Sequence, residues 1–215
     1  MKIARVMALV CCCVVVSAQA ADTAPSQDIQ NLQHQWVLAN YKTNGELRQA
    51  DLSVLASKAK KIADKYPNDP KALVWKGIIF TSYGKELGGL SSASINKQAR
   101  LALQQAINID PKVMHGAAYT TLGTLYYRTP GWPTGFADKD KAQENFAKAL
   151  EIAPNDRDAN YYYGEFLLQQ KQYNQALAAL HKAMQTADEK SMAAVAQQRR
   201  QQVQKAIDKA SAKSA

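Results

Sequence analysis

The side chains that could carry out acid–base or metal chemistry are few in this chain and far apart in its sequence. The three histidines, His34, His115 and His181, fall in three separate stretches. His181 and Met184 could share one helix face, but two ligands do not make a metal site. No G-x-S-x-G, H-E-x-x-H or phosphate-binding glycine loop occurs. We therefore expect no enzymatic activity, no metal and no cofactor.

A second group of side chains could bind a ligand without reacting with it. Residues 128–136 read Arg-Thr-Pro-Gly-Trp-Pro-Thr-Gly-Phe. The prolines and glycines bend and stiffen the backbone, while Trp132 and Phe136 carry large apolar surfaces. Such a loop either clamps a ligand or folds its aromatic side chains back onto the protein, and the residues alone leave both alternatives open.

These residues must be positioned by helices, because amphipathic helical periodicity runs through most of the chain, and it repeats. Three segments that end one helix and open the next are alike: 66–69 (Tyr-Pro-Asn-Asp), 109–112 (Ile-Asp-Pro-Lys) and 153–156 (Ala-Pro-Asn-Asp). Their prolines recur at spacings of 44 and 43 residues. Since proline cannot continue a helix, each one marks a turn between units. Repetition at this length indicates a stack of helical units.

Small and large residues also recur at matched positions of these units. The matched sets are Ala99, Leu103 and Ala106, then Ala142, Phe146 and Ala149, then Ala176, Leu180 and Ala183; the other helix of each unit carries Gly77, Gly123 or Gly164. Small residues let two antiparallel helices approach closely, and large ones fill the groove between them. This pattern resembles the tetratricopeptide repeat, which reads W-x2-L-G-x2-Y, then A-x3-F, then P, over about 34 residues.

The resemblance implies an all-α fold, a right-handed α-solenoid of helix-turn-helix pairs with a C-terminal capping helix. The expected single domain, 28–209, divides into a divergent repeat at 28–67, repeats at 69–111, 112–154 and 156–188, and a capping helix at 189–209, followed by a tail at 210–215. The extra length of two repeats lies between their helices, so both insertions should emerge at the same edge of the stack.

The first helix of each pair should line the concave side of such a stack. The candidate residues of this groove and of the loop beside it are Thr120, Thr124, Tyr127, Arg128, Trp132, Phe136, Tyr161 and Glu165. Members of the family that bind peptides often hold a C-terminal carboxylate with lysine and asparagine along this groove. This sequence has threonine, tyrosine and glutamate there instead, which departs from that type.

A second resemblance covers residues 126–168, with their Pro-Gly-Trp-Pro insertion, an Asp-Lys-Asp-Lys-Ala helix start and the segment Asn-Tyr-Tyr-Tyr-Gly-Glu-Phe-Leu at 160–167. This run is similar to the periplasmic T-component family, which is associated with tripartite ATP-independent (TRAP) transporters. The resemblance implies a solute-binding protein as partner and a hydrophobic ligand. The repeat fold itself favours a protein-interaction scaffold whose partner is another envelope protein. The alternative, from the second resemblance, is an accessory component of such a transport system that binds a small lipophilic ligand. Self-association stays open.

The N-terminus predicts export. Lys2 and Arg5 precede an apolar run at 6–16, and an Ala-x-Ala pattern ends at Ala20, so residues 1–20 read as a signal peptide cleaved after Ala20. The apolar run is too short for a stable membrane span. All three cysteines lie in this segment, so the mature chain must fold by packing alone. We expect a flexible stretch at 21–27 and a periplasmic or secreted protein; no nucleic-acid partner is expected, because no nucleic-acid-reading motif is present.

Overall fold

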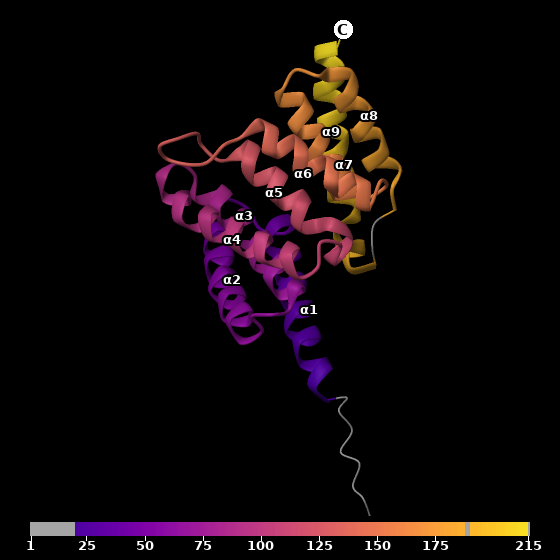
Figure 1. Ribbon diagram of the computed structural model, residues 1–215. Helices are drawn as coiled ribbons and strands as arrows, with labels where there is room; N and C mark the ends of the chain where they lie inside the picture. The colour runs from indigo at the N-terminus through magenta and orange to yellow at the C-terminus, as the bar shows by residue number, and fades with distance from the viewer. Residues whose placement is uncertain (1–19, 188–189, 215) are drawn as a thin grey trace, which may run out of the picture.

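The computed structural model describes residues 20–187 and 190–214, and all the regular secondary structure in these ranges is helical (Figure 1). The signal peptide predicted at 1–20 lies, except for its last residue, outside the described residues. The described part of the chain is a stack of helix pairs, and the predicted all-α solenoid is confirmed.

Eight helices of the described part form four pairs. They are α1 (Ala20–Tyr41) with α2 (Gly45–Lys65), α3 (Pro70–Leu87) with α4 (Ala93–Ile109), α5 (Ala117–Arg128) with α6 (Lys139–Ile152), and α7 (Arg157–Gln169) with α8 (Tyr173–Gln185). Short 3-10 turns stand at η1 (Leu90–Ser92), η2 (Val113–Gly116) and η3 (Lys190–Val195), and α9 (Ala196–Ser214) ends the described chain. Each pair packs against the next, and α9 covers α8.

The two ends differ from the predicted boundaries. Helix α1 includes residues 21–27, for which the sequence predicts a flexible stretch. The predicted cap at 189–209 consists of η3 and α9, and α9 continues to Ser214 through most of the predicted tail. The continuation has a packing reason, because Ala206 and Ala210, four residues apart on one helix face, are both buried.

Aspartate caps fix where the helices begin. The Asp69 carboxylate accepts hydrogen bonds from the backbone N–H groups of Lys71 and Ala72, at 2.8 and 3.1 Å. Asp156 caps α7 in the same way by accepting from the N–H of Ala159 at 2.7 Å. These caps satisfy backbone donors that the first turn of a helix leaves unpaired. The repeated turns of the sequence are therefore the starts of α3 and α7.

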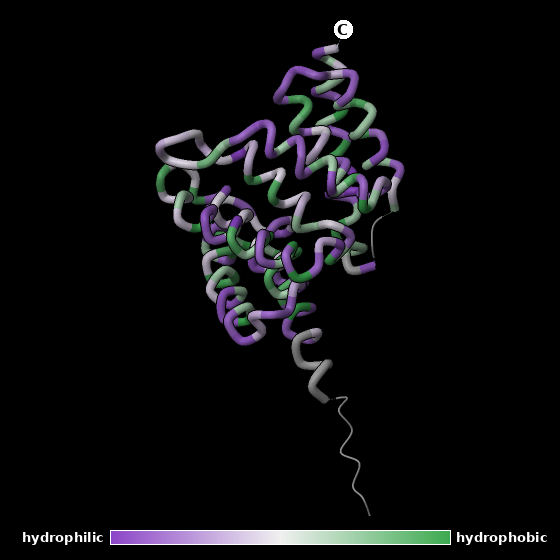
Figure 2. Tube along the Cα trace, in the orientation of Figure 1, coloured by the Kyte–Doolittle hydropathy of each residue, from purple (hydrophilic) through white to green (hydrophobic). Residues whose placement is uncertain are grey.

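Inside three of the pairs, a glycine of the first helix lies against the large residue of the second. A Cβ added at the glycine would meet that side chain at 2.4 Å for Gly77 and Leu103 and at 2.6 Å for Gly164 and Leu180, which are closer than real Cβ contacts, and at a tight 3.0 Å for Gly123 and Phe146. Hydrophilic and hydrophobic residues are interleaved along the helices (Figure 2), as amphipathic packing requires. Close approach at these glycines therefore sets the spacing within each pair.

The two insertions take different forms at the same edge of the stack, which lies at the left of the view (Figure 1). Between α3 and α4 the extra residues form the last turns of α3 and the short η1, so little free loop remains. Between α5 and α6 they form a loop at 129–138. Only the second insertion extends away from the helices.

We predict that Gly164→Ala lowers the free energy of unfolding by about 1–3 kcal/mol, because the new methyl group collides with Leu180. This cost exceeds the gain of about 1 kcal/mol that alanine brings to a helix interior. Chemical denaturation measures the change. The control Gly131→Ala has no neighbouring atom within 4 Å and should change stability by less than about 0.5 kcal/mol. Equal stability of the two variants would contradict the close-approach explanation.

Candidate functional site

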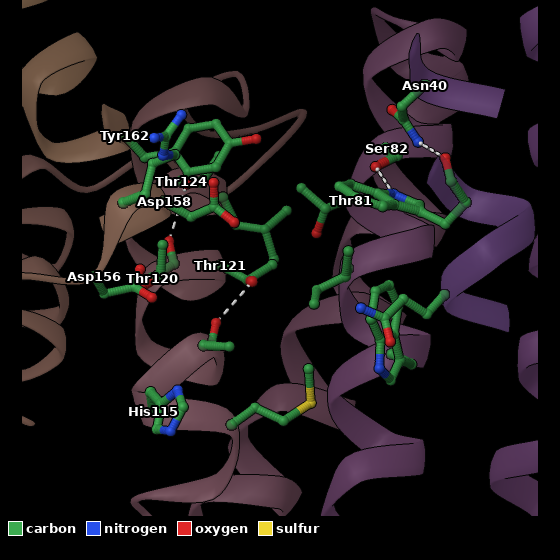
Figure 3. A pocket seen from close by; sticks show the side chains of 18 of the residues that line it. Asn40, Thr81, Ser82, His115, Thr120, Thr121, Thr124, Asp156, Asp158 and Tyr162 are labelled. Carbon is green, nitrogen blue, oxygen red and sulfur yellow. Dashed lines mark hydrogen bonds between the residues drawn. The ribbon is translucent and has the colours of Figure 1, made fainter. Parts of the chain in front are cut away.

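The first helices of the four pairs surround a cavity of about 1580 Å³ on the concave side of the stack (Figure 3). Each helix contributes one stripe of side chains to the wall. Central members of these stripes are Trp36 and Asn40 of α1, Trp75, Ile78, Thr81 and Ser82 of α3, Thr120, Thr121 and Thr124 of α5, and Asp158 and Tyr162 of α7. The prediction that first helices line the concave side therefore describes the wall correctly.

The wall formed by α1 and α3 is fixed by aromatic and polar contacts. The Trp36 indole N–H donates to the Ser82 hydroxyl oxygen at 2.9 Å, and its ring meets the Trp75 ring edge-on at 5.8 Å between centroids. Asn40 donates to the backbone carbonyl of Trp36 at 2.9 Å. Since Trp36 and Trp75 are buried, this wall is rigid and only part of each ring faces the cavity.

Threonines give the wall a bias toward hydrogen-bond acceptors. The hydroxyl groups of Thr81, Thr121 and Thr124 each donate to the backbone carbonyl four residues earlier, at 2.7, 2.8 and 2.9 Å. Their single donor hydrogen is thus satisfied inside the helix, while the oxygen can still accept. A ligand at these positions would meet methyl groups and acceptor oxygens.

The two ends of the stack meet beside the cavity. The guanidinium group of Arg199, on α9, donates to the Asp158 carboxylate of α7 at 2.8 Å and to the Tyr41 hydroxyl of α1 at 3.3 Å. The Arg199 side chain is only 7% exposed. We call these three residues the closing contact, because they join the first helix to the last. The groove of an open solenoid is here a chamber with one wall completed by the C-terminal segment.

The cavity wall also contains a left-handed turn. Met114, His115 and Gly116 of η2 have φ angles of 48°, 55° and 80°, and both Met114 and His115 line the cavity. This conformation costs an ordinary residue about 1–2 kcal/mol. Gly116 was the only signal of it in the sequence, because glycine alone adopts positive φ without that cost.

Burial governs the protonation of the tyrosines around this site. It raises the pKa values of Tyr127, Tyr161 and Tyr162 above the ordinary value of 10.0, and it is the largest cause for each of them. The charge of Glu165 raises the pKa of Tyr161 further, and the charge of Arg128 opposes the increase. These phenols stay neutral wherever the protein is folded at ordinary pH.

The structure brings three of the predicted groove residues to the cavity, namely Thr120, Thr124 and Arg128. Tyr127 instead packs its ring against Phe146 and Phe166, at 6.0 and 5.8 Å between centroids. It therefore belongs to the core between pairs rather than to the wall.

On α7 the lining is displaced from the predicted register. Tyr161 is buried, and Glu165 forms an ion pair with Arg128 at 3.0 Å without lining the cavity. Tyr162 and Asp158 line it instead. Consecutive residues of a helix point about 100° apart. An error of one position among three consecutive tyrosines therefore assigns a core side chain to the cavity wall and a wall side chain to the core.

The aromatic loop does not reach the cavity with either of its aromatic side chains. Trp132 is 90% exposed, whereas the Phe136 ring packs edge-on against Tyr126 at 5.7 Å and under the Arg100 guanidinium at 4.3 Å. Backbone hydrogen bonds from Gly135 to Gly131 and from Ala137 to Pro130 hold the loop in shape. Of the two alternatives for this loop, Phe136 folds back onto the protein, whereas Trp132 projects into solvent.

The described residues contain no metal-binding cluster and no helix that could cross a membrane. Within 20–187 and 190–214, no cluster of three or more histidine, cysteine, aspartate or glutamate side chains could hold a metal ion. No helix of the part that the structure describes has the length and apolar character needed to cross a membrane.

We predict that Arg199→Ala destabilises the protein by about 1.5–3 kcal/mol, the usual value of a hydrogen bond to a charged group. Asp158 is partly exposed, so water can solvate it after the change and the loss stays below that of a fully buried pair. Chemical denaturation gives the difference. Lys148→Ala, which breaks an exposed ion pair with Glu144, should cost about 1 kcal/mol or less; equal losses would refute the importance of the closing contact.

We also predict that stability falls as pH rises above 10. Below this pH the three raised tyrosines are protonated in both states; above it the unfolded chain releases protons that the folded chain retains, which favours unfolding. Phenolate absorbance should therefore show a fraction that appears only together with unfolding, and Tyr162→Phe should reduce that fraction. A titration in which every tyrosine ionises before the helices are lost would disprove this.

Comparison with known proteins supports the repeat assignment. Residues 138–199 match the family model described as tetratricopeptide repeat. No curated protein matches the chain. Two crystal structures of MamA are among the similar solved structures, with 19% and 17% sequence identity and TM-scores of 0.45 and 0.43. The matches cover 77% and 87% of this chain and 90% and 92% of those chains. Residues 138–199 thus match the tetratricopeptide repeat, and the stacked helix pairs, with the glycine contacts within three of them, have the architecture of that repeat.

Proposed function

We propose that this protein is a binding scaffold that holds a segment of a partner protein in the chamber, rather than an enzyme. The observation that carries the proposal is the cavity itself, to which all four pairs contribute a stripe. Its volume of about 1580 Å³ exceeds the roughly 300–1000 Å³ of sites for small ligands. A polypeptide segment uses such a volume better than a small molecule does.

The chemistry of the wall supports a polypeptide as the occupant. An extended segment carries unpaired backbone N–H groups, and the threonine oxygens of α3 and α5 are acceptors at intervals along the wall. The contacts of Trp36 and Trp75 hold the wall formed by α1 and α3 in place before a ligand arrives. Such preorganisation reduces the ordering cost of binding.

We propose that the protein acts in the periplasm or outside the cell and that its partner is another envelope protein. The basic, apolar and Ala-x-Ala pattern of residues 1–20 supports export. A second candidate function is that of an accessory component of a TRAP-type transport system that holds a small lipophilic ligand. The apolar part of the wall, with Trp75, Ile78 and Tyr162, favours this candidate.

Photo-crosslinking inside cells tests the scaffold proposal. Thr121→p-benzoylphenylalanine places the reactive group on the cavity wall, and the same replacement of Lys148 places it on α6, away from the cavity. We expect a discrete protein adduct from position 121 and none from position 148, with mass spectrometry identifying the crosslinked segment. A small lipophilic molecule as the adduct at 121 would favour the transport candidate, and protein adducts of equal yield at both positions would overturn the chamber as the binding site.

A further inference from the structure

We propose that the edge of the stack formed by the turns inside the first three pairs is a membrane-binding surface, which attaches the protein to the headgroup region of a bilayer containing anionic lipid. We call it the loop edge. It consists of these three turns with one helical turn on either side, residues 38–48, 84–96 and 125–142. The proposal goes beyond the scaffold function and does not depend on what the chamber holds.

Contacts between neighbouring pairs hold the three turns along one edge. Arg48, near the start of α2, forms an ion pair with Glu86 of the last turn of α3 at 3.6 Å, which joins the first turn to the second. The guanidinium group of Arg100, on α4, lies over the Phe136 ring at 4.3 Å, which joins the second pair to the loop at 129–138. The second and third turns are seen together at the left of Figure 1.

The most exposed large apolar side chains of the described residues lie on this edge, one in or beside each turn. Trp132 is 90%, Leu90 72% and Leu47 68% exposed. Single exposed apolar residues are ordinary on a protein surface. Here the three highest exposures come from three successive pairs and share one edge, which indicates a surface that contacts an apolar phase.

Trp132 is held away from the protein by a loop of defined shape. The Phe136 ring packs against Tyr126 at 5.7 Å, and the backbone N–H of Asp138 donates to the carbonyl of Tyr126 at 3.0 Å. The exposed position of Trp132 is therefore a property of the folded loop. An indole in this position suits a bilayer interface, where the ring enters the headgroup region and the N–H stays hydrated.

Charge distinguishes the loop edge from the opposite edge of the same three pairs. The loop edge contains six lysine and arginine residues and four aspartate and glutamate residues. The opposite edge, at 62–73, 106–120 and 149–160, contains four and six. Of the exposed large apolar side chains in the described part of the chain, the opposite edge holds only Ile109, at 44%. Positive charge and apolar exposure thus coincide on one edge, and this combination binds anionic bilayer surfaces.

The cations of the loop edge include one unpaired lysine beside each turn, namely Lys42, Lys85 and Lys139. Among the described residues, none of their ammonium groups lies within 4.0 Å of a carboxylate. Within the same part of the chain, the carboxylates of Glu46 and Asp140 on this edge have no ion pair either. The positive excess is therefore small. It selects anionic lipid, while the apolar side chains supply most of the attachment.

The exposed side chains are too few for a stable interface with a second copy of the chain. Even at about 250 Å² each, the area of the largest aromatic side chain, three of them supply less than the roughly 800 Å² per partner of a standard interface. A fluid bilayer accepts separate side chains one by one, as interfacial anchors. The available area therefore favours a lipid surface as the occupant.

Vesicle binding by the exported protein, whose intact mass establishes where its chain begins, tests the inference. The vesicles contain phosphatidylcholine and phosphatidylglycerol in equal parts. The emission of Trp132 is obtained by subtracting the spectrum of Trp132→Gln, because Trp36 and Trp75 are buried and common to both proteins. We expect this emission to shift to shorter wavelength on binding and to be quenched by lipids brominated near the headgroup.

Co-sedimentation with the same vesicles measures affinity. Leu90→Gln and Trp132→Gln should each weaken binding about three- to tenfold. The matched control Leu101→Gln, which removes an exposed leucine from the middle of α4, should leave it unchanged. Vesicles of phosphatidylcholine alone should bind at least threefold more weakly, and this difference should shrink at high salt.

Absence of Trp132 quenching at millimolar lipid would overturn the membrane proposal. A loss for Leu101→Gln as large as that for Leu90→Gln would show that the loop edge is not the binding surface. Equal affinity for phosphatidylcholine alone would overturn the selection of anionic lipid, and a dimer that Trp132→Gln dissociates would assign the edge to a second copy instead. The scaffold proposal is judged separately, by the adducts at Thr121.

Discussion

The close approach of two helices at a glycine is the constraint on which this structure depends. Gly77, Gly123 and Gly164 bring α3, α5 and α7 so near their partner helices that a Cβ at these positions would crowd the facing side chain. The residues they face, Leu103 and Phe146 among them, are fully buried. Because the same contact recurs in successive pairs, the pairs have similar shapes and stack in one direction.

The stacking direction in turn determines which side chains can act together. Since first helices follow first helices along the concave side, one stripe from each is brought to a common space, although the stripes are about 40 residues apart in sequence. The hydroxyl groups of Thr81 and Thr121 bond to their own helices, and that of Ser82 accepts from Trp36, so the walls do not rely on a ligand for their shape. A chamber built in this way is a by-product of repeat packing and needs no dedicated binding motif.

Most of the fold could be predicted from the sequence, because periodicity and recurring small residues are local signals. The details of the site were harder. The run of tyrosines at 161–163 satisfies more than one helical register, and only packing against Phe166 and its neighbours decides which ring faces the cavity. The contact between Tyr41 and Arg199 joins residues 158 positions apart, so no local sequence pattern predicts it. Exposure of Trp132 likewise depends on Phe136, which anchors the loop.

The closing contact has a consequence for how this protein can change. An open solenoid is approximately one-dimensional, so units can be duplicated or deleted at little cost to their neighbours. Here the buried Arg199 of α9 contacts Tyr41 of α1. Inserting or removing one pair would move α1 and α9 relative to each other and break this contact. The number of repeats is thereby fixed at the number that brings the ends together, and the two termini lose their independence, so that fraying at one end loosens the other.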